Sequence, residues 1–172
     1  MRKPTFAVTL MIIAFTTFVA CSDSSTNADV EEENGQGSFT LSGDVQSSFE
    51  GSAIFVTTNA GGIFTGTLVI SDDAEDTFSL VFTTSSTNPV SIPTGVYAID
   101  IPESIGDGTI FVATFTDFTN DVPKVFQTKQ DTGGSLTVSR STDQLLEGTF
   151  QFEALGNSGE EVTVEGSFSA VK

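Results

Sequence analysis

The residues best suited to chemistry are acidic groups in two short stretches, 72–76 and 117–121. The first stretch contains Asp72, Asp73, Glu75 and Asp76, and the second contains Asp117, Asn120 and Asp121. The carboxylate and amide oxygens of these side chains are the ligands that Ca²⁺ prefers. Neither stretch has the spacing of an EF-hand, which places a Gly at the sixth position and a Glu at the twelfth. Because the chain holds 23 acidic residues, solvated acidic turns are the simpler interpretation, and we predict no metal ion or other cofactor.

The rest of the composition excludes most other chemistry. The chain has no His, so it cannot build a Ser-His-Asp or Cys-His centre, and its one Cys cannot form an intrachain disulfide. Six basic residues against 23 acidic ones give a net charge of −17, which excludes nucleic acid as a partner. Lys124, Lys129 and Arg140 are too few for a phosphate site. With no Trp and one Tyr (Tyr97), the chain has few aromatic rings that could stack on a sugar substrate. Taken with the missing catalytic groups, this composition predicts that the protein is not an enzyme.

The N-terminus has the layout of a signal peptide. Basic residues occur within positions 1–3, an apolar run follows over residues 6–19, and the stretch ends in Phe18, Val19, Ala20 and Cys21. This ending resembles the lipobox of bacterial lipoproteins, although Phe18 stands where that pattern prefers Leu. The resemblance implies cleavage between Ala20 and Cys21 and acylation of Cys21. An ordinary secretory signal is the alternative.

An acidic segment follows the signal peptide of residues 1–20. Loss of that peptide removes two basic residues, so the mature charge is 4 − 23 = −19. Residues 21–37 are polar and acidic, which is typical of a flexible tether; we call them the acidic tether. Ser22 after the Cys resembles lipoproteins of the outer membrane. We therefore expect attachment to the membrane of a bacterial cell envelope through the lipid anchor, on the periplasmic or the surface side.

From residue 38 to residue 172 the sequence predicts one all-β domain. Apolar and polar residues alternate with a period of two, most clearly over 145–155 and 161–170, which indicates an antiparallel hairpin with one solvated face. Turn-rich pieces separate about ten such segments. The expected strands are residues 38–43, 49–57, 63–70, 77–83, 95–101, 109–117, 123–128, 134–140, 145–155 and 161–170. They predict an antiparallel meander that forms a β-sandwich or an up-and-down barrel.

Phenylalanine is the expected core residue. Thirteen of the 16 Phe residues follow the signal peptide, and each stabilises the fold by about 1.5–3 kcal/mol when buried. Gly148 and Gly166 interrupt two of the apolar strand faces. A glycine at such a position marks a β-bulge or a place where an aromatic ring lies across the backbone.

The C-terminal stretch carries a second resemblance. Residues 134–139 and 146–154 follow the patterns G-x-L-x-[IV]-[ST] and L-x-G-T-F-x-F-x-A, and residues 162–168 read V-x-V-x-G-x-F, one residue shorter than the pattern V-x-V-x-x-G-x-F. About forty residues in all are similar to the end of small uncharacterised Bacteroidota-type β lipoproteins. That family has no assigned activity, so the resemblance implies an envelope location and no specific chemistry.

Two functions fit these observations. The first is a non-catalytic structural, accessory or binding module on a lipid anchor, with an envelope protein as its partner. The second is a lipoprotein that holds a small apolar ligand in a lipocalin-like cavity. A cavity lined by Phe78, Phe82, Phe150 and Phe152 favours the second function, and a close-packed interior favours the first.

Overall fold

The computed structural model describes residues 35–72, 77–87, 91–102 and 109–172. The signal peptide and most of the acidic tether lie outside these ranges, so the expectations for Ala20 and Cys21 stay predictions. The last residues assigned to the tether are described, and they belong to the fold, because the first strand begins at Gln36. No described segment forms a helix with the length and apolar character needed to cross a membrane.

All ten expected strands are present, with small shifts at their ends. They are β1 (Gln36–Gly43), β2 (Ser47–Ala60), β3 (Ile63–Ser71), β4 (Phe78–Ser86), β5 (Gly95–Ile99), β6 (Ile110–Asp117), β7 (Lys124–Thr128), β8 (Gly134–Ser141), β9 (Leu145–Gly156) and β10 (Glu161–Val171). The prediction of an all-β fold is therefore confirmed.

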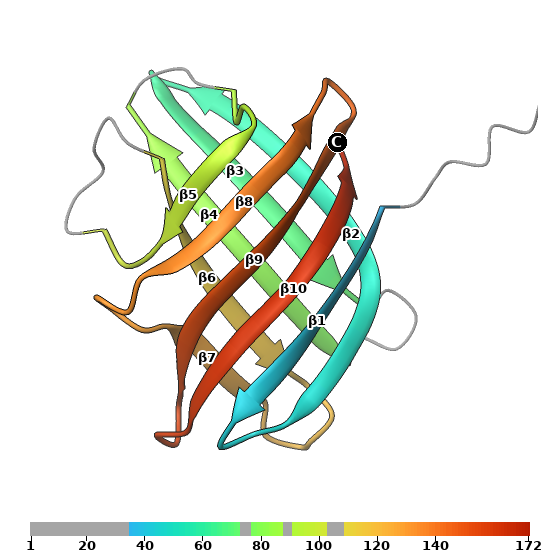
Figure 1. The fold of residues 1–172 in the computed structure, drawn as a ribbon, viewed down its shortest axis with the longest axis vertical. Helices are drawn as coiled ribbons and strands as arrows, with labels where there is room; N and C mark the ends of the chain where they lie inside the picture. Colours follow the sequence, from blue (N-terminus) through green and yellow to red (C-terminus); the bar gives the residue numbers. More distant parts are fainter. Residues whose placement is uncertain (1–34, 73–76, 88–90, 103–108) are drawn as a thin grey trace, which may run out of the picture. The chain divides into compact units, whose positions relative to one another are not determined.

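The strands form a closed barrel (Figure 1). Nine of them make a ring in the order β1, β2, β3, β4, β6, β5, β8, β9 and β10, and β1 pairs with β10 to close it. Most neighbours are antiparallel, whereas β5 runs parallel to β6. Of the two architectures that the sequence left open, the structure has the barrel.

The tenth strand, β7, lies in a fork between β6 and β9. At one end of the barrel β6 pairs with β5, through Ile110 and Phe111, and β8 continues the sheet to β9. At the other end β7 alone joins β6 to β9. Thr128 lies where the fork opens: its hydroxyl accepts from the N–H of Ala113 at 2.8 Å and donates to the carbonyl of Ala113 at 3.0 Å. A side chain thus takes the place of a backbone partner.

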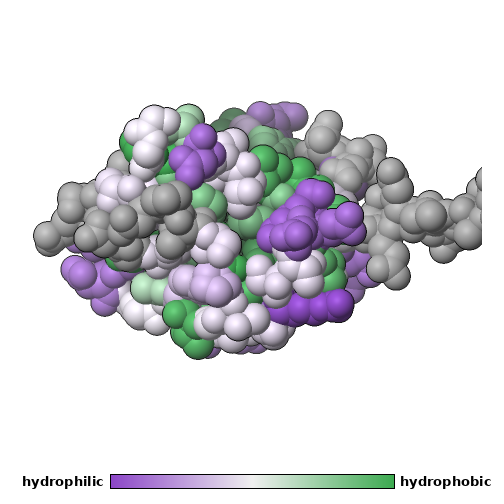
Figure 2. Space-filling view, turned by 90° about the horizontal axis from the view of Figure 1, so that it is seen from above, coloured by the Kyte–Doolittle hydropathy of each residue, from purple (hydrophilic) through white to green (hydrophobic). Residues whose placement is uncertain are grey.

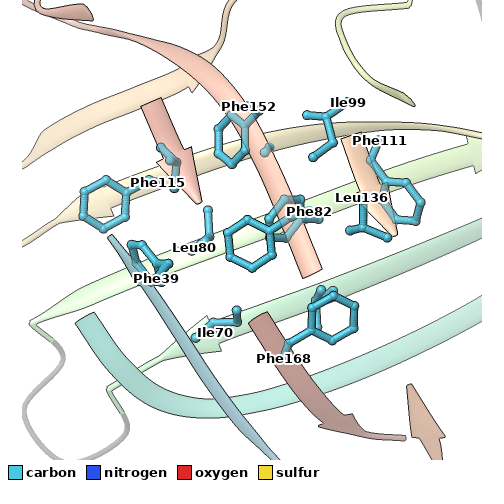
Figure 3. Packing of buried hydrophobic residues seen from close by; sticks show 14 of the residues in the cluster. Phe39, Ile70, Leu80, Phe82, Ile99, Phe111, Phe115, Leu136, Phe152 and Phe168 are labelled. Carbon is cyan, nitrogen blue, oxygen red and sulfur yellow. The ribbon is translucent and has the colours of Figure 1, made fainter. Parts of the chain in front are cut away.

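The barrel interior is filled by one side of every strand. In β3 and β4 buried residues alternate with half-buried ones, as the period of two predicts. Eleven of the thirteen Phe residues are buried in the core, where they pack with Leu, Ile and Val (Figure 3). Phe49 is partly buried against this core. Phe118 departs from the expectation, because it lies just beyond the end of β6 and is 46% exposed.

Two glycines make room for rings inside the barrel. Gly148 lies opposite Phe168 and Gly166 lies opposite Phe150 in the β9–β10 register. A Cβ atom added to Gly148 would lie 2.1 Å from the Thr137 carbonyl oxygen and 2.8 Å from the Phe168 ring. One added to Gly166 would lie 2.2 Å from the Ser38 carbonyl oxygen and 2.7 Å from the Phe150 ring. The rings therefore lie directly over the glycine backbone, which is one of the two expectations for these positions. A bulge also occurs beside Gly148, on the facing strand β8 between Val138 and Arg140.

Two buried threonines provide a matched test of the fork. Thr128 is 3% exposed and makes both hydrogen bonds to Ala113, whereas Thr84 is 2% exposed and its hydroxyl has no hydrogen-bond partner among the described residues. We expect Thr128→Val to lower the free energy of unfolding by about 1–3 kcal/mol, because it leaves the peptide groups of Ala113 unpaired. Thr84→Val removes an unsatisfied hydroxyl, so we expect no loss. Urea denaturation measures both, and equal losses would contradict the role of Thr128.

Candidate functional site

The four phenylalanines proposed to line a ligand cavity lie against other rings instead. The ring centroids of Phe82 and Phe150 are 4.8 Å apart, and those of Phe82 and Phe152 are 5.8 Å apart. Phe78 packs against Phe39 at 5.6 Å and Phe49 at 5.0 Å. These are distances of direct aromatic contact. The interior is therefore filled at these residues.

The aromatic contacts cross the whole interior. Phe126 on β7 stacks on Phe115 at 5.8 Å, and Phe115 meets the edge of Phe39 at 5.3 Å. Phe39 reaches Phe150 at 6.5 Å, which stacks on Phe168 at 6.4 Å. Several of these side chains point toward one another from facing strands (Figure 3). Opposite walls of the barrel are thus connected by rings.

Asp72 and Asp117, one residue from each acidic stretch, lie near the same end of the barrel. Asp72 accepts a hydrogen bond from the Thr77 hydroxyl at 2.9 Å, and the Thr77 carbonyl accepts from the N–H of Phe118 at 2.8 Å. Asp117 accepts from the N–H and the hydroxyl of Thr119. These carboxylates therefore hold turns. Asp73, Glu75 and Asp76 lie outside the described residues, and the described part of the chain contains no group of three or more acidic, His or Cys side chains that could hold a metal ion.

The basic residues are dispersed over the barrel. The Lys129 ammonium lies 3.0 Å from a Glu161 carboxylate oxygen. The Nη1 of Arg140 lies 3.6 Å from the Oε2 of Glu147. The hydrogen bond that the Lys129 ammonium donates to Glu161 raises the pKa of Lys129. The Nζ of Lys172 donates to the Thr142 carbonyl and lies 5.6 Å from the centre of the Phe55 ring. Exposed pairs of this kind contribute little to stability, and they form no common basic surface.

The candidate binding surface is a polar hollow on the outside of the barrel. It extends over β1, β2, β8, β9 and β10 and has a volume of about 610 Å³. Its lining is rich in hydroxyl-bearing residues and also includes Phe39, Phe49, Phe150 and Gly166. The polar residues that line it are Ser38, Thr40, Ser48, Glu50, Ser135, Thr137, Thr149, Gln151, Glu165 and Ser167. A second hollow, of about 640 Å³, shares Ser38, Glu50 and Ser167 with it. Together they offer hydrogen-bond donors and acceptors over five neighbouring strands.

The alternation of polar and apolar residues in the sequence indicates which side chains of this surface face outward, but it does not identify the surface itself. The polar members of each alternating strand face outward, but only the register shows which of them become neighbours. Across the sheet, Thr137 lies opposite Thr149, Thr149 opposite Ser167, and Ser167 opposite Ser38. Such a row can form noncovalent contacts with a polar partner.

Comparison of the chain with known proteins identified no relative. No protein-family model matches the chain, and no curated protein or solved structure is significantly similar to it. The resemblances to bacterial lipoproteins therefore stay predictions from the sequence.

Tyr97, the only tyrosine of the chain, reports on the β5 side of the barrel. Its hydroxyl donates to the Pro93 carbonyl at 2.6 Å, and its ring meets the edge of Phe111 at 5.8 Å. Burial raises the pKa of Tyr97 above its ordinary value of 10.0. The folded protein therefore keeps the phenolic proton at a pH where the unfolded chain has lost it.

We expect an absorbance titration of tyrosinate to give a midpoint above 10.0 in the folded protein and a return to the ordinary value in concentrated urea. Because the unfolded state releases the proton first, the free energy of unfolding should fall as the pH rises above 10.0. Since Tyr97 is the only tyrosine of the chain, the tyrosinate signal belongs to it alone. Identical midpoints with and without urea would contradict this environment.

Proposed function

We propose that this chain is a non-catalytic module of a bacterial cell envelope, held by a lipid at Cys21 and separated from the membrane by the acidic tether. The observation that carries the proposal is the filled interior. Phe82 and Phe152 are fully buried and in ring contact. A barrel packed in this way acts through its outer surface.

The polar hollow over β1, β2, β8, β9 and β10 is the surface that best supports such a role. Its hydroxyl groups can bond to a peptide backbone or to polar side chains of an envelope protein. Two of its lining residues, Glu50 and Glu165, are acidic. The strongly negative charge of the chain disfavours acidic partners, so we expect a partner surface that is uncharged or basic.

An apolar ligand inside the barrel is the alternative function. Closed barrels of this size class include ligand binders, so the architecture is compatible with it. It would require free volume between Phe78, Phe82, Phe150 and Phe152. The distances of 4.8 Å and 5.8 Å from Phe82 to its two neighbours favour a packed core instead.

The anchor is tested by replacing the proposed acylated residue. We expect the wild-type chain, expressed in a bacterium with an outer membrane, to sediment with membranes and to carry diacylglycerol and an acyl chain on an N-terminal Cys21. Cys21→Ala removes the sulfur that receives the lipid, so the variant should lose this modification and the membrane association that depends on it.

Ser22→Ala is the matched control, because it alters the adjacent residue and leaves the sulfur in place. We expect it to remain acylated and bound to membranes. Mass spectrometry of the purified N-terminus distinguishes the outcomes. An unmodified Cys21 thiol, or residues 1–20 still attached to the purified wild-type protein, would refute the anchor.

A further inference from the structure

Charged residues are unevenly distributed around the barrel wall. Residues 51–71, 77–87 and 109–116 contain no charged side chain, in a chain with 23 acidic residues. These segments supply β3, β4, most of β2 and all of β6 except its last residue; we call their outer surface the neutral wall. The opposite wall consists of β8, β9, β10 and β1, in front in Figure 1, and its outer surface carries Glu153 and Glu165. One side of the barrel is therefore acidic and the other is neutral.

Apolar side chains lie on the outside of the neutral wall. Ile54 on β2 lies opposite Val69 on β3, and Val69 lies opposite Val81 on β4. Each alternates with buried residues along its strand, so all three point outward. Ile54 is 46% exposed, and Val56 on the same side of β2 is 53% exposed. Seen from the end of the barrel with the β2–β3 turn, hydrophobic residues reach the surface between polar ones (Figure 2). An apolar patch of this kind is typical of contact with a protein or a membrane.

The described chain begins at the border of the neutral wall. The N–H of Ala53 donates to the Gly35 carbonyl at 2.8 Å, so the segment that comes from Cys21 joins the barrel next to Ile54. A polar coil of the length of residues 22–34 spans about 20 Å on average. An anchor at Cys21 would therefore keep this border of the barrel close to the membrane.

A cation lies at the same border. Val171 pairs with Ile54, and the Nζ of the next residue, Lys172, lies 5.6 Å from the centre of the Phe55 ring. The ammonium donates to the Thr142 carbonyl, which holds it at this place. A lysine beside exposed apolar side chains is the combination that binds anionic lipid surfaces. The border of the neutral wall thus offers both kinds of contact.

We propose that the neutral wall lies against the lipid surface that holds the chain, with Ile54 and Val56 in contact with it. This inference rests on the anchor at Cys21 proposed above. Anionic lipids of the envelope repel the acidic wall, and in this orientation the width of the barrel separates that wall from the lipid by more than the Debye length of about 8 Å. The polar hollow, which extends over the opposite wall, then stays accessible to a partner protein.

Position favours lipid over a protein as the occupant of the neutral wall. The start of the described chain at Gly35, the exposed Ile54 and Val56, and the ammonium of Lys172 all lie at one border of the wall. A short tether keeps this border near the lipid, whereas a protein partner must arrive by diffusion. The high local concentration of lipid therefore makes even a weak contact effective.

Photocrosslinking from single positions tests the orientation. The photoreactive residue p-benzoylphenylalanine replaces Val56 in one version of the full chain and Thr149 in another, and the bacteria that express them are irradiated. Thr149 is the matched control, because it is also exposed and outward-facing but lies on the acidic wall. We expect at least about fivefold more lipid adduct from position 56, measured by mass spectrometry. Equal yields, or adducts of position 56 with protein instead of lipid, would overturn the proposal.

A charge placed in the neutral wall tests the physical cause. Thr58 is exposed and lies two residues beyond Val56, on the same side of β2. With the probe at Val56, Thr58→Glu should lower the yield of lipid adduct at least about threefold, because anionic lipid repels the new carboxylate. Thr58→Gln, which has the same size and no charge, should retain the yield. Thermal melting identifies any variant that has lost the fold, and an undiminished yield in folded Thr58→Glu would contradict the orientation.

Mass spectrometry of Cys21 in the same samples separates this inference from the anchor. An acylated Cys21 with equal yields from positions 56 and 149 would leave the anchor intact and refute the orientation. A free Cys21 thiol would refute the anchor instead. That thiol can then be coupled to a maleimide lipid in vesicles of phosphatidylethanolamine and phosphatidylglycerol, where a higher yield from position 56 would support the orientation and equal yields would overturn it.

Discussion

Contact between aromatic rings across the barrel is the interaction on which the rest of the structure depends. Phe126, Phe115, Phe39, Phe150 and Phe168 follow one another at centroid distances of 5.3–6.5 Å, so facing walls are held at the spacing of these rings. A closed sheet without such a filling would enclose a cavity or collapse. The rings decide both the dimensions of the barrel and the absence of ligand space beside Phe82 and its neighbours.

The closed sheet contains small or polar residues at two kinds of position where an ordinary strand residue would not fit. Gly148 and Gly166 lack the Cβ atom that would collide with the carbonyl oxygens of the neighbouring strands and with the rings of Phe168 and Phe150. Thr128 bonds to both peptide groups of Ala113 at the fork between β6 and β9. With these two devices the sheet closes on itself, through the pairing of β1 with both β2 and β10.

Much of the fold could be predicted from the sequence, because the alternation of residues such as Phe150 and Phe152 with Gln151 fixes which face of a strand is buried. The closure could not, since it rests on pairs of distant residues such as Phe39 and Gly166. The polar hollow was missed for the same reason: Ser38, Thr149 and Ser167 become neighbours only through the register. The acylation of Cys21 stays a prediction from a local motif, because Cys21 lies outside the described residues.

Xenon binding in crystals under pressure tests the filled interior most directly, because xenon enters apolar cavities that proteins keep dry. The wild-type barrel should show no xenon between Phe78, Phe82, Phe150 and Phe152. Phe82→Ala, which removes a fully buried ring, should create a site there that xenon occupies. Xenon among these rings in the wild-type protein would contradict the packed interior and favour a barrel that holds an apolar ligand.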